Sequence, residues 1–170
     1  MSEESTNPYS EIETLKKEGN DLYVKNDYEL AIQKYNEALD LIINLNINDD
    51  KTLLKLKSVL LSNRAACRLE LNDTTGALSD SIAAVDSDQT NMKAYYRQSQ
   101  AVLKINENNI KDNYAIWKKA SLNCESSSLL TKYYKEAYFT WIKNGHRSDP
   151  ISDNNDLYDR YTLLSNSKAR

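Results

Sequence analysis

The sequence predicts an all-α protein built from paired helices. Only 3 Gly and 2 Pro occur in 170 residues, whereas average usage would give roughly 12 and 8. Because β-sandwiches and glycine-loop nucleotide enzymes need many turn glycines, this composition favours long helices. Apolar residues also recur at intervals of three and four along most of the chain, which is typical of amphipathic helices.

Seven helices follow from this spacing. Ser10 and Glu13 match a capping box, so the first helix should begin at about residue 11 with Ser10 as its N-cap. The helices are expected at about residues 11–25, 28–42, 52–71, 75–86, 92–105, 110–123 and 127–143. The Asn/Asp-rich residues 44–51 should form a loop or a frayed helix end. Residues 1–9 are expected to be a flexible leader, and residues 146–170 a polar tail that is disordered or contains one short helix at about 156–164.

Composition restricts the function. The 22 basic and 25 acidic residues give a net charge of −3 and a pI near 5.3, which argues against a nucleic-acid-binding domain. No apolar run approaches the roughly 18 to 20 residues that span a bilayer, so no membrane association is expected. Cys67 and Cys124 lie far apart without a CxxC motif, which indicates reduced core thiols in a cytoplasmic protein. Because no catalytic, phosphate-binding or metal-binding motif is present, we expect neither an enzyme nor a cofactor or metal site.

Five polar residues stand at matching places on alternate helices. Lys16 and Asn20 are four residues apart on the first predicted helix, and Lys93 and Arg97 have the same spacing on the fifth. Residues four apart share one helix face. Asn63 occurs on the third helix, within the string Ser-Asn-Arg-Ala. If alternate helices line a common groove, three cations and two amides converge there.

A repeat underlies this arrangement. Its first unit has Leu15, Gly19, Tyr28, Ala31, Tyr35 and Ala38 at the spacing of a helix-turn-helix unit of about 34 residues. Ala77 and Ala84 are seven residues apart in a later helix, as Ala31 and Ala38 are in the first unit. Over residues 10–125 the chain resembles tetratricopeptide-repeat domains of the dicarboxylate-clamp type. Asn63 comes about a dozen residues late, so we expect extended second and third helices or an inserted loop.

The resemblance implies a right-handed superhelix over residues 10–145. Its repeats would cover about 11–45, 52–87 and 91–123, with a capping helix at about 127–144. It also implies that Lys16, Asn20, Asn63, Lys93 and Arg97 form a carboxylate clamp. In the family this clamp binds the C-terminal Glu-Glu-Val-Asp of cytosolic heat-shock protein 90 or 70. Tyr23, Ala66 and Leu69 are expected to form an apolar pocket for the penultimate Val.

Two other interpretations stay open. The chain could be a repeat scaffold that binds a non-chaperone partner along its groove, or the detached repeat domain of a larger protein. The sequence does not distinguish heat-shock protein 70 from 90 as the partner. A capped solenoid of this size is expected to be a monomer.

Overall fold

The computed structural model describes residues 8–45 and 50–146, and in this part of the chain it confirms the all-α prediction. Its helices are α1 (Pro8–Val24), α2 (Tyr28–Asn44), α3 (Lys51–Glu70), α4 (Thr74–Ser87), α5 (Met92–Ile105), α6 (Ile110–Asn123) and α7 (Ser128–Lys143). Residues 1–7 of the predicted leader, residues 46–49 of the predicted loop and residues 147–170 of the predicted tail, with its short helix, lie outside the described residues.

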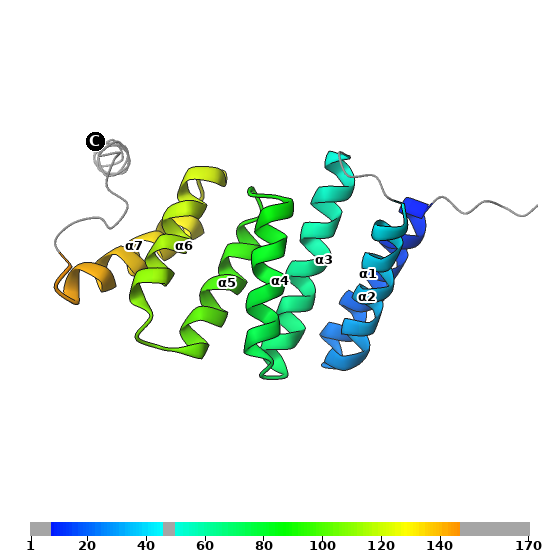
Figure 1. Ribbon diagram of the computed structural model, residues 1–170, viewed down its shortest axis with the longest axis horizontal. Coiled ribbons are helices and arrows are strands. Elements are labelled where there is room, and N and C mark those ends of the chain that lie inside the picture. The colour runs from blue at the N-terminus through cyan, green and yellow to red at the C-terminus, as the bar shows by residue number, and fades with distance from the viewer. Residues whose placement is uncertain (1–7, 46–49, 147–170) are drawn as a thin grey trace, which may run out of the picture.

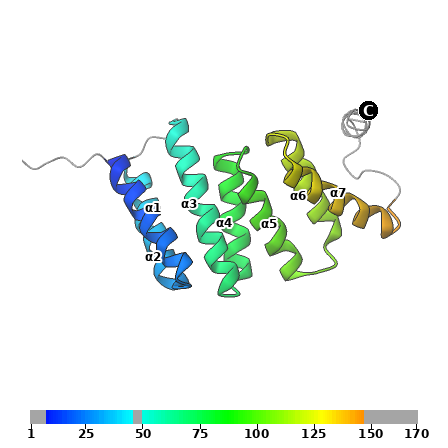
Figure 2. The same ribbon diagram turned by 180° about the vertical axis from the view of Figure 1, so that it is seen from behind.

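The helices stack in a row of hairpins (Figures 1 and 2). Each helix contacts the next one along the chain, and the alternate helices α1, α3 and α5 also contact one another in sequence. The α1–α2 hairpin forms one end of the row and α7 the other. Within the described residues the main contacts join neighbouring hairpins, as in other repeat folds, so alternate helices can line one continuous surface.

The start of α1 differs from the sequence prediction. The helix begins at Pro8, and Ser10 lies inside its first turn, where the Ser10 carbonyl accepts a hydrogen bond of 2.8 Å from the Thr14 hydroxyl. Proline suits the first helical position because the missing N–H would have no partner there. Tyr9 also donates a hydrogen bond of 2.6 Å to Asp50 at the start of α3, which ties down this turn. The predicted capping box at Ser10 is therefore wrong.

The remaining helix ends agree closely with prediction. The N-caps of α3, α4, α5 and α7 each accept a backbone N–H with a side-chain oxygen; these residues are Asp50, Asp73, Asn91 and Ser127. Lys51, which the sequence assigned to the loop, is the first residue of α3. The expected extension is present, since α2 and α3 have 17 and 20 residues whereas α4, α5 and α6 have 14 each.

The small residues at the repeat positions are buried in the core. Ala31, Ala38, Ala77 and Ala84 are all completely buried. At the C-terminal end, aromatic rings fill the space between α6 and α7: Trp117 stacks on Tyr133 with ring centroids 4.7 Å apart. Leu130, Ala137 and Trp141 of α7 are buried, so this helix packs its apolar side against α6. No helix of the described ranges is long and apolar enough to cross a bilayer.

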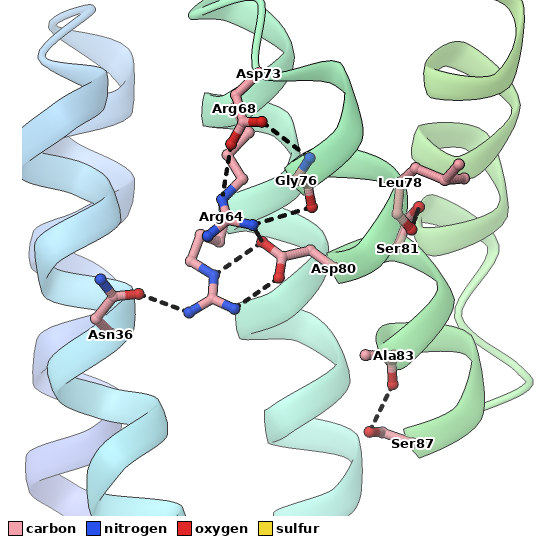
Figure 3. Close-up of polar contacts among 10 residues, drawn as sticks. All are labelled: Asn36, Arg64, Arg68, Asp73, Gly76, Leu78, Asp80, Ser81, Ala83 and Ser87. Carbon is pink, nitrogen blue, oxygen red and sulfur yellow. Dashed lines mark hydrogen bonds and ion pairs between the residues drawn. The ribbon is translucent and has the colours of Figure 1, made fainter. Parts of the chain in front are cut away.

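An ion-pair network joins the first two hairpins (Figure 3). Arg64 of α3 donates two hydrogen bonds to the Asp80 carboxylate of α4, at 2.8 and 2.6 Å. Its remaining terminal nitrogen donates to the Asn36 amide oxygen of α2 at 2.6 Å. Arg68 lies 3.3 Å from the same carboxylate. Asp80, with a side chain only 5% exposed, therefore holds α3 against α4 while Arg64 reaches back to α2.

Replacement of Asp80 should destabilise the fold strongly. Asp80→Ala leaves the mostly buried Arg64 guanidinium without its carboxylate, so we expect the free energy of unfolding to fall by about 3 kcal/mol. Urea denaturation followed by circular dichroism measures this. Asp86→Ala, an exposed aspartate on the same helix, makes the same charge change and should have little effect. Equal losses in the two variants would contradict the role given to Asp80.

Candidate functional site

A cavity of about 450 Å³ lies between α1, α3 and α5. Four of the five predicted clamp residues line it: Asn20, Asn63, Lys93 and Arg97. The other lining residues are Tyr23, Val24, Tyr35, Ser62, Ala66 and Tyr96. The cavity thus collects side chains that are up to 77 positions apart in the sequence, counted from Asn20 to Arg97.

The close approach of α1 and α2 positions Asn20. Gly19 is buried against the ring of Tyr35, and a Cβ at Gly19 would lie only 2.5 Å from a carbon of that ring. The Tyr35 hydroxyl donates a hydrogen bond of 2.9 Å to Asn20 Oδ1. Asn63 Nδ2 donates to the same oxygen at 2.9 Å. With its oxygen engaged in this way, Asn20 directs N–H donors rather than an acceptor toward a ligand.

The protonation state of Tyr35 supports this arrangement. Its side chain is 1% exposed, and burial raises the pKa of Tyr35 well above its usual value. The hydroxyl therefore keeps its proton at neutral pH and remains a donor to Asn20.

Two cations from α5 give the cavity its charge. Lys93 and Arg97 are one turn apart, and the Arg97 guanidinium carbon lies 5.4 Å from the centroid of the Tyr96 ring. Arg97 also donates a hydrogen bond of 2.8 Å to Gln100 Oε1. The described residues that line the cavity include no carboxylate, so two positive charges face it without an acidic neighbour in the lining.

Two predicted site residues lie elsewhere. Lys16 is not part of the lining and pairs with Glu13 of the same helix. Leu69 is 7% exposed and packs with Ala65, Ala77 and Ala101 in a separate apolar cluster between α3, α4 and α5. Because Leu69 points into this cluster, the structure does not bring it to the cavity, and we leave it out of the proposed pocket.

The lining contains apolar residues that the sequence reasoning missed. Val24 is 80% exposed and follows Asn20 by one helical turn, while Tyr96 follows Lys93 by three residues. Both spacings place the apolar residue beside a predicted polar one. That spacing is the signal that could have identified them.

The site offers donors and cations beside an apolar wall. No group of three or more metal-ligating side chains occurs in residues 8–45 and 50–146. Burial raises the pKa of the Cys67 thiol to about 11, so this thiol is protonated at neutral pH and a poor nucleophile. As predicted, Cys67 is buried, whereas Cys124 is partly exposed. The arrangement suits a ligand with carboxylates and an adjacent apolar side chain.

Comparison with known proteins gives relatives for part of the chain, and no protein-family model matches it. The chain is 41% identical over 91 residues, 54% of its length, to protein unc-45 homolog B of Xenopus laevis. It is 29% identical over 123 residues, 72% of its length, to the Hsp70/Hsp90 co-chaperone CNS1 of Saccharomyces cerevisiae. The chain spans only 9% and 30% of these two proteins.

A solved structure shares the fold. The chain is similar to the first TPR of Spaghetti (RPAP3), which was solved bound to the HSP90 peptide SRMEEVD. The TM-score is 0.61 at 20% sequence identity, covering 78% of this chain and 97% of that one. The chain therefore has the tetratricopeptide-repeat fold that its sequence predicted.

The tight contact at Gly19 gives a direct test of how the site is built. Alanine would favour the helix by about 1 kcal/mol relative to glycine, but its Cβ would collide with the buried Tyr35 ring. We expect Gly19→Ala to lower the free energy of unfolding by about 1 to 3 kcal/mol, measured in urea. Lys17→Ala, an exposed position of α1, should not destabilise. A Gly19→Ala variant as stable as the wild type would contradict the close approach.

Proposed function

We propose that this chain is a co-chaperone-type interaction module of the cytoplasm that binds the acidic C-terminus of heat-shock protein 90 or 70. The ligand would be the terminal Glu-Glu-Val-Asp with its free carboxylate. The observation that carries the proposal is the cavity in which two asparagines and two cations from α1, α3 and α5 meet without a carboxylate in the lining.

The chemistry of the ligand matches that of the cavity. A terminal Asp has two carboxylates on one residue, which would accept hydrogen bonds from Asn20, Asn63 and Lys93. Arg97 would bind a preceding acidic side chain or a backbone carbonyl. Each charge-assisted hydrogen bond contributes about 1.5 to 3 kcal/mol. Several of them, less the free energy of ordering the peptide, give micromolar affinity, about −8 kcal/mol.

The apolar part of the lining would receive the penultimate Val of the peptide. Tyr23 and Ala66, both predicted for this role, line the cavity together with Val24 and Tyr96. Burying a Val side chain against this wall adds about 1.5 kcal/mol or more. A peptide with an acidic residue in place of the Val would lose this contribution.

The relatives support the same ligand class. The structural neighbour RPAP3 was solved with an HSP90 peptide that ends in EEVD, and the yeast relative is named as an Hsp70/Hsp90 co-chaperone. These two observations concern the relatives and not this chain. They make the C-termini of the two chaperones the first ligands to test on this chain.

Calorimetry with synthetic octapeptides tests the proposal. The C-terminal octapeptides of heat-shock proteins 70 and 90 would each be titrated with a free and with an amidated C-terminus. We expect micromolar binding of at least one free acid and loss of that binding on amidation, because amidation removes one of the two terminal carboxylates. Equal affinity for the free and amidated forms would contradict the clamp and favour a partner bound along the groove.

Removal of the α5 cations should weaken binding without unfolding the chain. We expect Lys93→Ala and Arg97→Ala each to reduce the affinity for the free-acid peptide by about tenfold or more. Lys111→Ala is the control, since this exposed lysine lies on α6 outside the cavity. Circular dichroism should show unchanged helicity in all three variants. Full affinity in the Lys93→Ala/Arg97→Ala double variant would exclude the proposed site.

A further inference from the structure

Glu13, Lys16 and Asn20 form a line along one face of α1. Seven residues separate Glu13 from Asn20, which is close to two full turns, so both point to the same side of the helix. Asn20 lines the cavity, and Glu13 lies on the same face about two turns before it. Lys16, between them, forms an ion pair with Glu13.

This ion pair explains why Lys16, unlike the other two predicted clamp cations, does not line the cavity. Lys93 and Arg97 line the cavity, and neither forms an ion pair with any residue in the described part of the chain. Lys16 is absent from the lining, and its ammonium is held by a carboxylate of its own helix. Its side chain is 23% exposed, so it is accessible to a competing carboxylate.

We infer that Glu13 is an intramolecular competitor that keeps Lys16 from the cavity until a ligand carboxylate displaces it. This inference rests on the proposed function and adds a residue that sets the affinity. On binding, Lys16 exchanges its Glu13 partner for a ligand carboxylate. Its contribution to the binding free energy is therefore only the difference between two similar ion pairs. The Glu13 carboxylate is then unpaired and close to the acidic peptide, so the two negative charges repel each other.

An ordinary surface pair would behave differently. A lysine and a glutamate three residues apart on a helix commonly contribute a few tenths of a kcal/mol to helix stability and nothing else. In that case removal of the Glu13 charge would slightly lower stability and leave peptide affinity unchanged. Peptide affinity, rather than stability, therefore distinguishes the two roles.

Glu13→Gln is the test, with Glu18→Gln as its matched control. Both changes remove one negative charge from α1, but Glu18 pairs with Lys34 of α2, at 3.2 Å, and lies on another side of the helix. In calorimetry with the free-acid octapeptide, we expect Glu13→Gln to bind about threefold more tightly than the wild type. Glu18→Gln should bind as the wild type does. Equal affinities of the two variants, with the wild type binding, would overturn this inference alone.

A double-mutant cycle shows whether the effect passes through Lys16. Lys16→Ala should weaken binding more in the Glu13→Gln background than in the wild-type background, because Lys16 contributes fully only when Glu13 no longer holds it. Identical effects of Lys16→Ala in the two backgrounds would overturn the inference. Absence of peptide binding by the wild-type chain would overturn the proposed function, and this inference with it.

Discussion

The bidentate contact between Arg64 and Asp80 is the interaction on which the geometry of the stack depends. It fixes α3 against α4 within one hairpin, and through Asn36 it fixes the same arginine against α2 of the hairpin before. Asn63 is adjacent to Arg64 in the sequence and about 100° away around the helix. Arg64 can therefore anchor α3 to its neighbours while Asn63 faces the cavity. The rotation of α3 about its own axis that brings Arg64 to Asp80 also directs Asn63 toward the cavity.

Sequence patterns predicted the elements of this fold because both helices and repeats leave periodic signals. Apolar spacing identified all seven helices of the described ranges, and the paired cations and amides on alternate helices identified four of the residues that line the cavity. The late position of Asn63 correctly indicated longer helices at the first junction. Each of these inferences depends only on the spacing of residues within a helix, and a single sequence contains that spacing.

The parts that were missed depend on relations between elements. Ser10 matches a capping box, but Pro8 is also a good first helical residue, and the bond from Tyr9 to Asp50 of α3 favours the earlier start. Leu69 has the right spacing for the cavity, yet the rotation of α3 against α4 turns it into a separate cluster. The helix position of Lys16 is readable from its spacing, but its ion pair with Glu13 is a side-chain contact that spacing alone does not determine. Tertiary rotation and side-chain pairing decided each of these cases.

Apart from Tyr35 of α2, the residues that line the cavity belong to α1, α3 and α5, each from a different hairpin. In a solenoid the hairpins fold and open as semi-independent units joined by nearest-neighbour interfaces. A ligand that contacts all three of these helices would bind only the state in which the three hairpins are packed together, with both interfaces between them closed. Ligand binding would then stabilise the fully packed array relative to states in which one hairpin has opened. Such partly opened states would become rarer, and the unfolding of the array would become more cooperative.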